Sequence, residues 1–250
     1  MILAILQARC SSTRMPNKVL EPILGEPMLA RQIERVRRAV QIDRLIVATS
    51  VDRSDDALQE LCETLIVECY RGDLNDVLDR YYQAAKSIVP EHVVRLTGDC
   101  PLIDPELIDM VILAHINSGA DYTSNAALPS YPDGLDVEVF KYSVLTQAWK
   151  EASLPSQREH VTLFMHQQSQ RFQIEHVRSP INLSHLRWTV DNPADFLLVT
   201  KIYEELYPQN NQFSTKAILA LMDEQPDLLR INQHLERNEG LQKSINADRN

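Results

Sequence analysis

The chain has 250 residues, 44% of them hydrophobic and 24% charged, a composition typical of a globular protein with an apolar core. Its net charge of −10 argues against nucleic acid or an anionic membrane surface as the main partner. That charge is uneven, because residues 1–40 carry seven cations against three acids. An acidic protein with a basic amino-terminal segment suits a small anionic ligand better than a polyanion.

Strand and helix patterns alternate in the first half of the chain, which predicts a mostly parallel sheet flanked by helices. Strands are expected at residues 2–6, 45–49, 65–67 and 93–96, and helices at 28–40, 54–61, 74–87 and 105–117. Ser54 is the expected cap of the second helix. Pro105 stands in the first turn of the fourth, where proline is favoured.

The pattern changes after Asp121. Residues 135–140 alternate apolar and acidic side chains, which predicts a strand with one solvated face. Further elements are expected as helices at 143–152, 157–168, 193–206 and 215–222, and as strands at 172–177 and 187–190. The polar residues 236–250 are expected to form a frayed tail.

The four cysteines form no C-x-x-C pair and lack zinc-finger spacing; they are Cys10, Cys62, Cys69 and Cys100. We therefore expect reduced thiols in a cytoplasmic protein. The first apolar run is predicted to be a strand, which leaves no place for a signal peptide. No apolar run is long enough to span a bilayer, so no membrane segment is expected.

The most informative segment is residues 6–18, L-Q-A-R-C-S-S-T-R-M-P-N-K, directly after the first predicted strand. Arg9, Arg14 and Lys18 lie there among hydroxyl-bearing residues, at the strand end where open α/β sheets bind ligands. Arginine matches phosphate bidentately and lysine adds a point charge, which indicates a triphosphate ligand. The alternative is a solvated basic loop.

Several other site types are disfavoured by what the sequence lacks. The six glycines are too dispersed for a dinucleotide fingerprint or a P-loop, and the histidines form no H-E-x-x-H. The sequence also contains no Asp-x-Asp pair, with which many sugar transferases hold a metal on a nucleotide sugar, and this argues against a glycosyltransferase.

Two acids occupy the ends of predicted strands, Asp99 in T-G-D-C-P and Asp191 in W-T-V-D-N-P. Carboxylates on separate strand ends can converge on one Mg²⁺, which prefers oxygen ligands and keeps waters and substrate phosphates. The alternative is that each aspartate caps the helix that follows it. The nearby basic segment favours the interpretation as metal ligands, because a triphosphate needs both Mg²⁺ and cationic side chains.

Four segments in order resemble the cytidylyltransferases that make CMP-activated acidic sugars: L-Q-A-R-x-x-S-T-R-x-P-x-K, G-E-P-M-L, T-G-D-C-P-L-I-D-P and W-T-V-D-N-P-A-D-F. Within that group the chain resembles the SpsF-like, spore-coat polysaccharide branch through three further segments, at residues 70–81, 132–139 and 158–161. The resemblance spans residues 1–205. It implies a GT-A-like, Rossmann-like nucleotide-diphospho-sugar transferase fold, Mg²⁺ dependence and a homodimer.

The resemblance implies condensation of CTP with an acidic sugar, to give a CMP-sugar and pyrophosphate for surface polysaccharide biosynthesis. Our leading acceptor is an eight- or nine-carbon keto-acid sugar, by analogy. Many relatives have proline where this chain has Gln7, so base preference is a weaker inference than reaction class. We expect one domain over residues 1–235, with a nucleotide-binding half at about 1–120 and a sugar-binding half at about 121–210.

Carried over by position, the catalytic residues that grip the triphosphate are Arg9, Arg14 and Lys18, and the metal ligands are Asp99 and Asp191. Further nucleotide-binding residues are Leu6, Ala8, Gly72, Asn75, Asp76 and Thr97. The sugar-binding residues are Asp133, Asp136, Glu138, Arg158 and His160.

Several of these assignments have structural alternatives. Residues 77–85 have helical spacing and fit an ordinary core helix, so only residues 72–76 are expected near the ligand. The acids of residues 133–138 can line the sugar pocket, add a metal ligand or face solvent on an edge strand. Neighbouring residues on a helix point in different directions, so Arg158, Glu159 and His160 cannot all reach one site.

Two other functions remain open from the sequence. One is a glycosyltransferase that uses a preformed nucleotide sugar on the same fold, releasing no pyrophosphate from NTP. The other is a non-catalytic nucleotide-binding subunit, against which the three cations and two aspartates argue.

Overall fold

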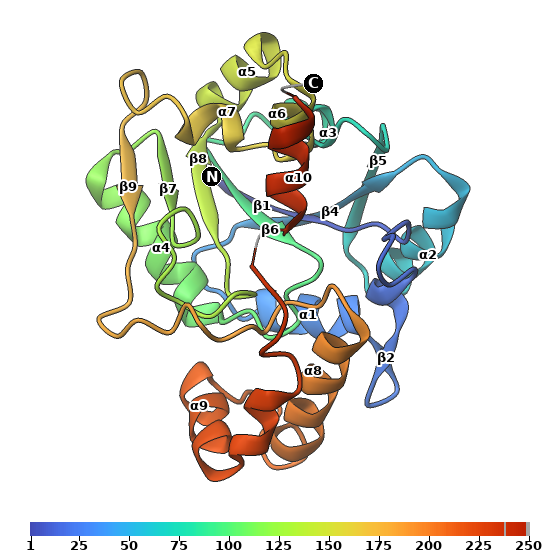
Figure 1. The fold of residues 1–250 in the computed structure, drawn as a ribbon. Coiled ribbons are helices and arrows are strands. Elements are labelled where there is room, and N and C mark those ends of the chain that lie inside the picture. The colour runs from blue at the N-terminus through green and yellow to red at the C-terminus, as the bar shows by residue number, and fades with distance from the viewer. Residues whose placement is uncertain (238, 249–250) are drawn as a thin grey trace.

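The structure is a computed structural model that describes residues 1–237 and 239–248. These residues form a seven-stranded sheet in the order β5-β4-β1-β6-β8-β7-β9, with helices on both faces (Figure 1). The strands are β1 (Ile2–Gln7), β4 (Arg44–Ser50), β5 (Glu68–Gly72), β6 (His92–Thr97), β7 (Tyr122–Ser124), β8 (Glu138–Lys141) and β9 (Ile174–His176). A separate hairpin pairs β2 (Pro22–Ile23) with β3 (Glu26–Pro27). Since β1, β4, β5 and β6 are parallel, the predicted sheet type is confirmed.

Both faces of the central strand β1 are buried, which explains its unbroken apolar sequence. Ala4 and Leu6 point into one core and Leu3 and Ile5 into the other, because successive side chains of a strand alternate. The first core is covered by α1 (Met28–Val36), α2 (Asp56–Thr64), α4 (Pro105–Ser118), α8 (Pro193–Leu206) and α9 (Thr215–Glu224). The second is covered by α3 (Val77–Lys86), α5 (Tyr142–Glu151) and α7 (Leu163–His166).

Two of the expected strands do not form at their predicted positions. Residues 65–67 form no strand, because Leu65 ends α2 and Ile66 turns the chain with φ at +51°; the strand is β5 instead. Residues 187–190 run close to residue 133 but make only one isolated bridge, between Asp133 and Arg187.

Several expected helices differ in their limits. The helix expected at 157–168 is two short ones, α6 (Pro155–Glu159) and α7, since Val161 between them has φ at +50°. Ser54 is not a cap: it lies within the 3₁₀ turn η2 (Arg53–Asp55), where Asp52 accepts from its N–H at 2.9 Å. The remaining 3₁₀ turns are η1 (Lys18–Leu20) and η3 (Pro226–Arg230).

The carboxyl end is ordered as α10 (Glu239–Ala247), where a frayed tail was expected. It lies in front of the sheet in Figure 1 and contacts α6. Residues 238, 249 and 250 of the expected tail lie outside the described residues. Among the helices described, none combines the length and apolarity needed to cross a membrane.

A histidine pair lies between α4 and β6, with His115 buried and His92 partly buried. His115 is 1% exposed, and its Nε2 lies 3.1 Å from Nδ1 of His92, while its Nδ1 lies 2.9 Å from the Thr123 hydroxyl. Burial, with a smaller contribution from His92, lowers the pKa of His115 to about 4. His115 is therefore neutral in the folded protein near pH 7.

Acid should weaken the fold through His115. Below its unfolded pKa of about 6.5 the unfolded chain binds the proton more tightly than the folded one, so the free energy of unfolding should fall by roughly 2–3 kcal/mol between pH 6.5 and 4. Urea unfolding at both pH values should show a shallower loss in His115→Gln. The exposed His234→Gln should behave as the wild type, and equal slopes in all three proteins would contradict the assignment.

Candidate active site

A cavity of about 510 Å³ opens where β1 and β6 end at their carboxyl termini. Its wall combines the basic segment, the residues after β6, the loop around residue 133, the α6–α7 turn and α10. The structure brings these predicted residues to its lining: Ala8, Arg9, Arg14, Lys18, Thr97, Asp99, Asp133, Asp136, Glu138, His160 and Asp191. Segments far apart in sequence therefore share one site.

Lys18 stands between the two predicted metal ligands. Its Nζ lies 2.9 Å from Oδ1 of Asp191 and 3.7 Å from Oδ2 of Asp99, and it donates to the Val190 carbonyl at 2.6 Å. Arg14 Nη2 lies 2.9 Å from the other oxygen of Asp191. Arg9 is exposed at the mouth of the cavity. The carboxyl ends of the parallel neighbours β1 and β6 thus bring the basic segment and Asp99 together. Asp191 joins them from a stretch that is not a strand of the sheet.

Neither aspartate is a helix cap. Asp104 caps α4 by accepting from Glu106 N–H at 2.9 Å, and Asn192 is the N-cap residue of α8. The carboxylates of Asp99 and Asp191 therefore face the cavity instead of a helix end.

The basic segment is tied to the sheet by a buried carboxylate that the sequence pattern did not reveal. Asp55 is 0% exposed and accepts from the N–H of Cys10 at 2.7 Å, from the N–H of Ser50 at 3.1 Å and from the Ser50 hydroxyl. Burial, aided by Asp55, raises the pKa of Cys10 to about 12, so this thiol stays protonated. Asp55 therefore holds the basic segment, the candidate phosphate-binding segment, in place at Cys10.

Arg187 joins the site to the carboxyl-terminal helices. Its guanidinium contacts Asp195 at 2.9 and 3.0 Å, Asp133 at 2.9 Å and Asp191 at 3.1 Å. Burial alone would lower its pKa, but the three carboxylates outweigh that and raise it. Gly134 permits the close approach of the chain around residue 133 to residues 187–189. Its φ is +102°, and a Cβ there would lie 2.4 Å from the Thr189 nitrogen. Only tertiary contacts reveal Arg187, since it was expected merely to begin a strand.

The wall of the cavity formed by β8 contains a buried acid, Glu138, that is paired with a cation of the protein. Glu138 accepts from Tyr122 at 2.5 Å and Thr162 at 2.7 Å, and pairs with Arg95, its cross-strand neighbour on β6. Burial would raise the pKa of Glu138, but Arg95 and the hydroxyls hold it below its usual range. The expected solvated face of this strand is therefore wrong, because Glu138 is only 7% exposed.

Asp133 and Asp136 pair with cations of the protein itself. Arg237, from the segment before α10, lies 2.8 Å from Asp136 and 3.5 Å from Asp133. Asp133 also binds Arg187. The sequence patterns did not single out Arg237, because its partners are about a hundred residues away.

Five predicted ligand contacts fall outside the lining. Asp76 and Arg158 bind each other at 2.5–3.0 Å, and Asp76 also accepts from Asp79 N–H at 2.8 Å to cap α3. The other three are Leu6, Gly72 and Asn75. Leu6 is fully buried and Asn75 is exposed. Their contact with a substrate stays a prediction.

The donor set fits a divalent cation held jointly with a phosphate. Among the described residues, the Asp99 carboxylate contacts the Cys100 thiol at 3.4 Å and the more distant Lys18, which leaves oxygen lone pairs available beside Asp191. Within the described residues no group of three or more acids, histidines or cysteines is arranged around a metal. Mg²⁺ commonly takes one or two carboxylates and completes its shell with water and phosphate oxygens.

Comparison with known proteins gives one consistent assignment. A sequence model of the cytidylyltransferase family matches residues 3–231. The spore coat polysaccharide biosynthesis protein SpsF of Bacillus subtilis is 32% identical over 233 residues, 90% of this chain and 95% of that protein. The 3-deoxy-manno-octulosonate cytidylyltransferase of Zea mays is 38% identical over 122 residues, 44% of this chain and 37% of that one. A cytidylyltransferase structure from Leptospira borgpetersenii superimposes with a TM-score of 0.87 at 27% identity, covering 91% and 96% of the two chains.

Replacing the buried anchor should loosen the basic segment. The Asp55 carboxylate accepts hydrogen bonds from Cys10 and Ser50, but in Asp55→Asn one oxygen becomes an amide nitrogen, which is itself a donor. At least one of these hydrogen bonds is lost, and the free energy of unfolding should fall by about 2 kcal/mol. Amide hydrogen exchange should accelerate at Cys10 and Ser50. Asp52→Asn, at an exposed acid with one local bond, is the control. Unchanged exchange at Cys10 would show that Asp55 does not hold the segment.

Proposed function

The chain belongs to the cytidylyltransferase family, and from that premise we propose that it condenses CTP with an acidic sugar, giving a CMP-sugar and pyrophosphate. The observation that carries the proposal is Lys18 between Asp99 and Asp191, with Arg14 beside it, at the ends of β1 and β6. A triphosphate and its metal need that combination of fixed cations and carboxylates. SpsF, by its name, acts in spore coat polysaccharide synthesis, which supports a surface polysaccharide as the destination of the product.

The basic segment would bind the triphosphate. Arg14 and Lys18 are already oriented by Asp191, and Arg9 is exposed and can reach an incoming phosphate. Preoriented donors stabilise developing charge without reorganisation during the reaction. Asp99 and Asp191 would hold Mg²⁺, which when bound offsets repulsion between the phosphate oxygens and the nucleophile.

In the reaction a hydroxyl of the sugar attacks the α-phosphorus of CTP in line. The new oxygen–phosphorus bond forms as the bond to the β-phosphate oxygen breaks, pyrophosphate leaves, and the hydroxyl proton passes to water. Catalysis of such a transfer is mainly positioning and charge stabilisation. Arg9, Arg14 and Lys18 would neutralise the pyrophosphate as it departs.

The acceptor would occupy the half of the cavity built from about residues 121–210. There the wall is made by Tyr122, Asp136, Glu138, His160 and His166. These side chains offer hydrogen bonds suited to sugar hydroxyls. An eight- or nine-carbon keto-acid sugar is the proposed acceptor class, and a homodimer in the cytoplasm is the proposed form.

Pyrophosphate release tests the reaction and its residues. With Mg²⁺, CTP, UTP, GTP, ATP and dTTP should be crossed with acidic and neutral sugars, and release should need CTP and an acidic sugar together. Lys18→Ala and Asp99→Asn should each lower kcat about a hundred- to a thousandfold, because each removes a preoriented charge. Lys216→Ala, at an exposed lysine of α9, should be unaffected.

The outcomes separate the alternatives. Near wild-type rates in either site variant, with unfolding curves like the wild type, would refute the site assignment. Turnover of a preformed nucleotide sugar without pyrophosphate would indicate a glycosyltransferase. CTP binding without any turnover would indicate a non-catalytic subunit.

A further inference from the structure

The last part of the chain, residues 232–248, reaches across the cavity; we call its described residues the C-terminal strap. In Figure 1 it rises from the α8–α9 region and ends in α10, in front of the central strands. Gly240, Leu241 and Lys243 of α10 line the cavity. The family sequence model matches only to residue 231, so the strap adds a wall beyond the matched region.

Specific contacts hold the strap at both ends. At its start, Asn232 Nδ2 donates to the Arg187 carbonyl at 2.9 Å and to Asp195 at 2.8 Å, and Asn232 is only 3% exposed. At its end, Ser244 donates to Glu159 at 2.8 Å, and Asp248 accepts from the N–H of Ser156 at 3.1 Å and from its hydroxyl. These bonds place α10 beside α6, on the acceptor side of the cavity.

The arginines on the acceptor side of the cavity form ion pairs with acids of the protein itself. Arg95 pairs with Glu138, Arg187 with Asp133, and Arg237 with Asp136. The two histidines of that wall offer no charge near neutral pH, because burial lowers the pKa of both His160 and His166. An anionic acceptor would therefore find each of these groups engaged or neutral.

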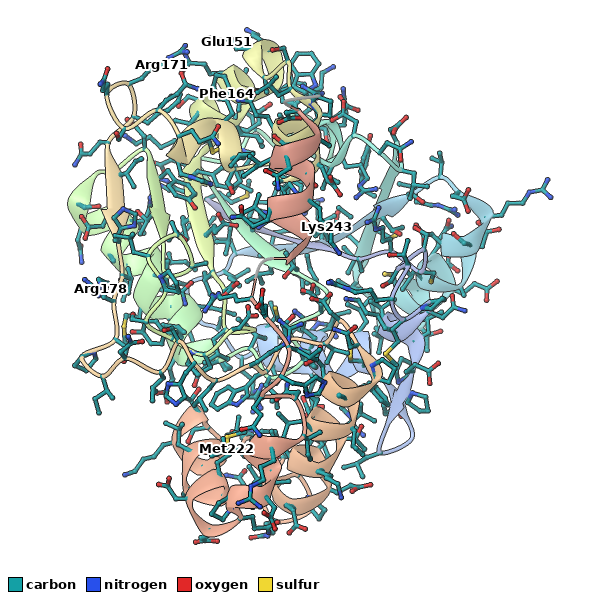
Figure 2. The ribbon with its side chains drawn as sticks, in the orientation of Figure 1. Glu151, Phe164, Arg171, Arg178, Met222 and Lys243 are labelled. Carbon is teal, nitrogen blue, oxygen red and sulfur yellow. The ribbon has the colours of Figure 1, made fainter. Side chains whose placement is uncertain are left out.

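Lys243 is the exception. It is exposed, it lines the cavity, and no hydrogen bond or ion pair engages it within the described part of the chain. Figure 2 shows it on α10, near the middle of the view and in front of the sheet. Gly240 lies three residues earlier on the same helix face, and nothing lies within 4 Å of where its Cβ would be. The long lysine stem thus borders open space in the cavity.

We propose that Lys243 binds the anionic group of the acceptor sugar, so that the strap selects acidic over neutral sugars. This inference rests on the proposed cytidylyl transfer for its substrate class. The phosphate-binding cations belong to the other wall, where Arg9 and Arg80 repel each other electrostatically and Arg14 and Lys18 face Asp191. Lys243 is thereby assigned to specificity and not to the triphosphate.

Steady-state kinetics should separate the two substrates. With 3-deoxy-manno-octulosonate and N-acetylneuraminate as probes, Lys243→Gln should raise the acceptor KM about tenfold, the effect of losing one partly solvated charge-assisted hydrogen bond. The KM for CTP should stay within about twofold of the wild type. Lys243→Arg should retain most of the affinity, and Lys216→Gln on α9 should match the wild type.

The preference for acids supplies a second readout. The wild type should favour each keto-acid sugar over its carboxyl-reduced analogue, and Lys243→Gln should lose most of that preference. An unchanged acceptor KM, or a rise in the KM for CTP alone, would overturn the inference.

A binding arm keeps this outcome distinct from failure of the proposed reaction. Calorimetry would follow the same sugars binding to the protein loaded with a non-hydrolysable α,β-methylene analogue of CTP. If the wild type releases no pyrophosphate but binds an acidic sugar more tightly than Lys243→Gln does, the reaction fails and the role of Lys243 stands. If binding is absent, or equal in both proteins, the role of Lys243 falls.

Discussion

One carboxylate organises the candidate active site. Asp191 binds Arg14 and Lys18 from the segment after β1 and Arg187 from its own strand-like stretch, at 2.9, 2.9 and 3.1 Å. Lys18 and Arg187 are buried, and a buried charge is stable only when it is paired and hydrogen-bonded. Segments about 170 residues apart are therefore held in one geometry by charge pairing. Arg187 extends the network to Asp195, so that the start of α8 is fixed as well.

The same pairing prepares the site for the proposed chemistry. Cations already oriented by Asp191 lose little rotamer freedom when a triphosphate arrives, and that saving favours binding. Asp99 differs from Asp191, because its carboxylate is 29% exposed and only loosely engaged by Lys18 at 3.7 Å. Asp191 thus also positions the cations around it, while Asp99 keeps its oxygens available for the proposed metal. A carboxylate with available oxygens beside preoriented cations suits a metal ion that is bound by both the protein and the phosphates.

The sequence predicted the parts of the site that follow from local pattern. Lys18 and Asp99 follow β1 and β6, whose parallel ends meet at one sheet edge, and the structure places them together as expected. Asp191 also lies beside Lys18, although the strand expected before it does not form. The sequence did not predict Arg95 with Glu138, because that pair depends on the antiparallel register of β6 and β8. Helix α10 was missed for a similar reason: its residues are polar, and its contacts lie on α6.

The proposed reaction and the proposed specificity thus reside in structurally separable parts of the chain. The charge network around Asp191 lies within the region that matches the family, whereas Lys243 lies beyond it. Among the described residues, the strap contacts that network through Asn232, the Glu236 carbonyl and Arg237, all before α10. Helix α10 itself is held by the hydroxyl and carboxylate bonds to α6. Changes in α10 can therefore alter the acceptor side without moving Lys18 or Asp99. With this arrangement the proposed acceptor selectivity can change while the geometry of the proposed phosphate site is kept.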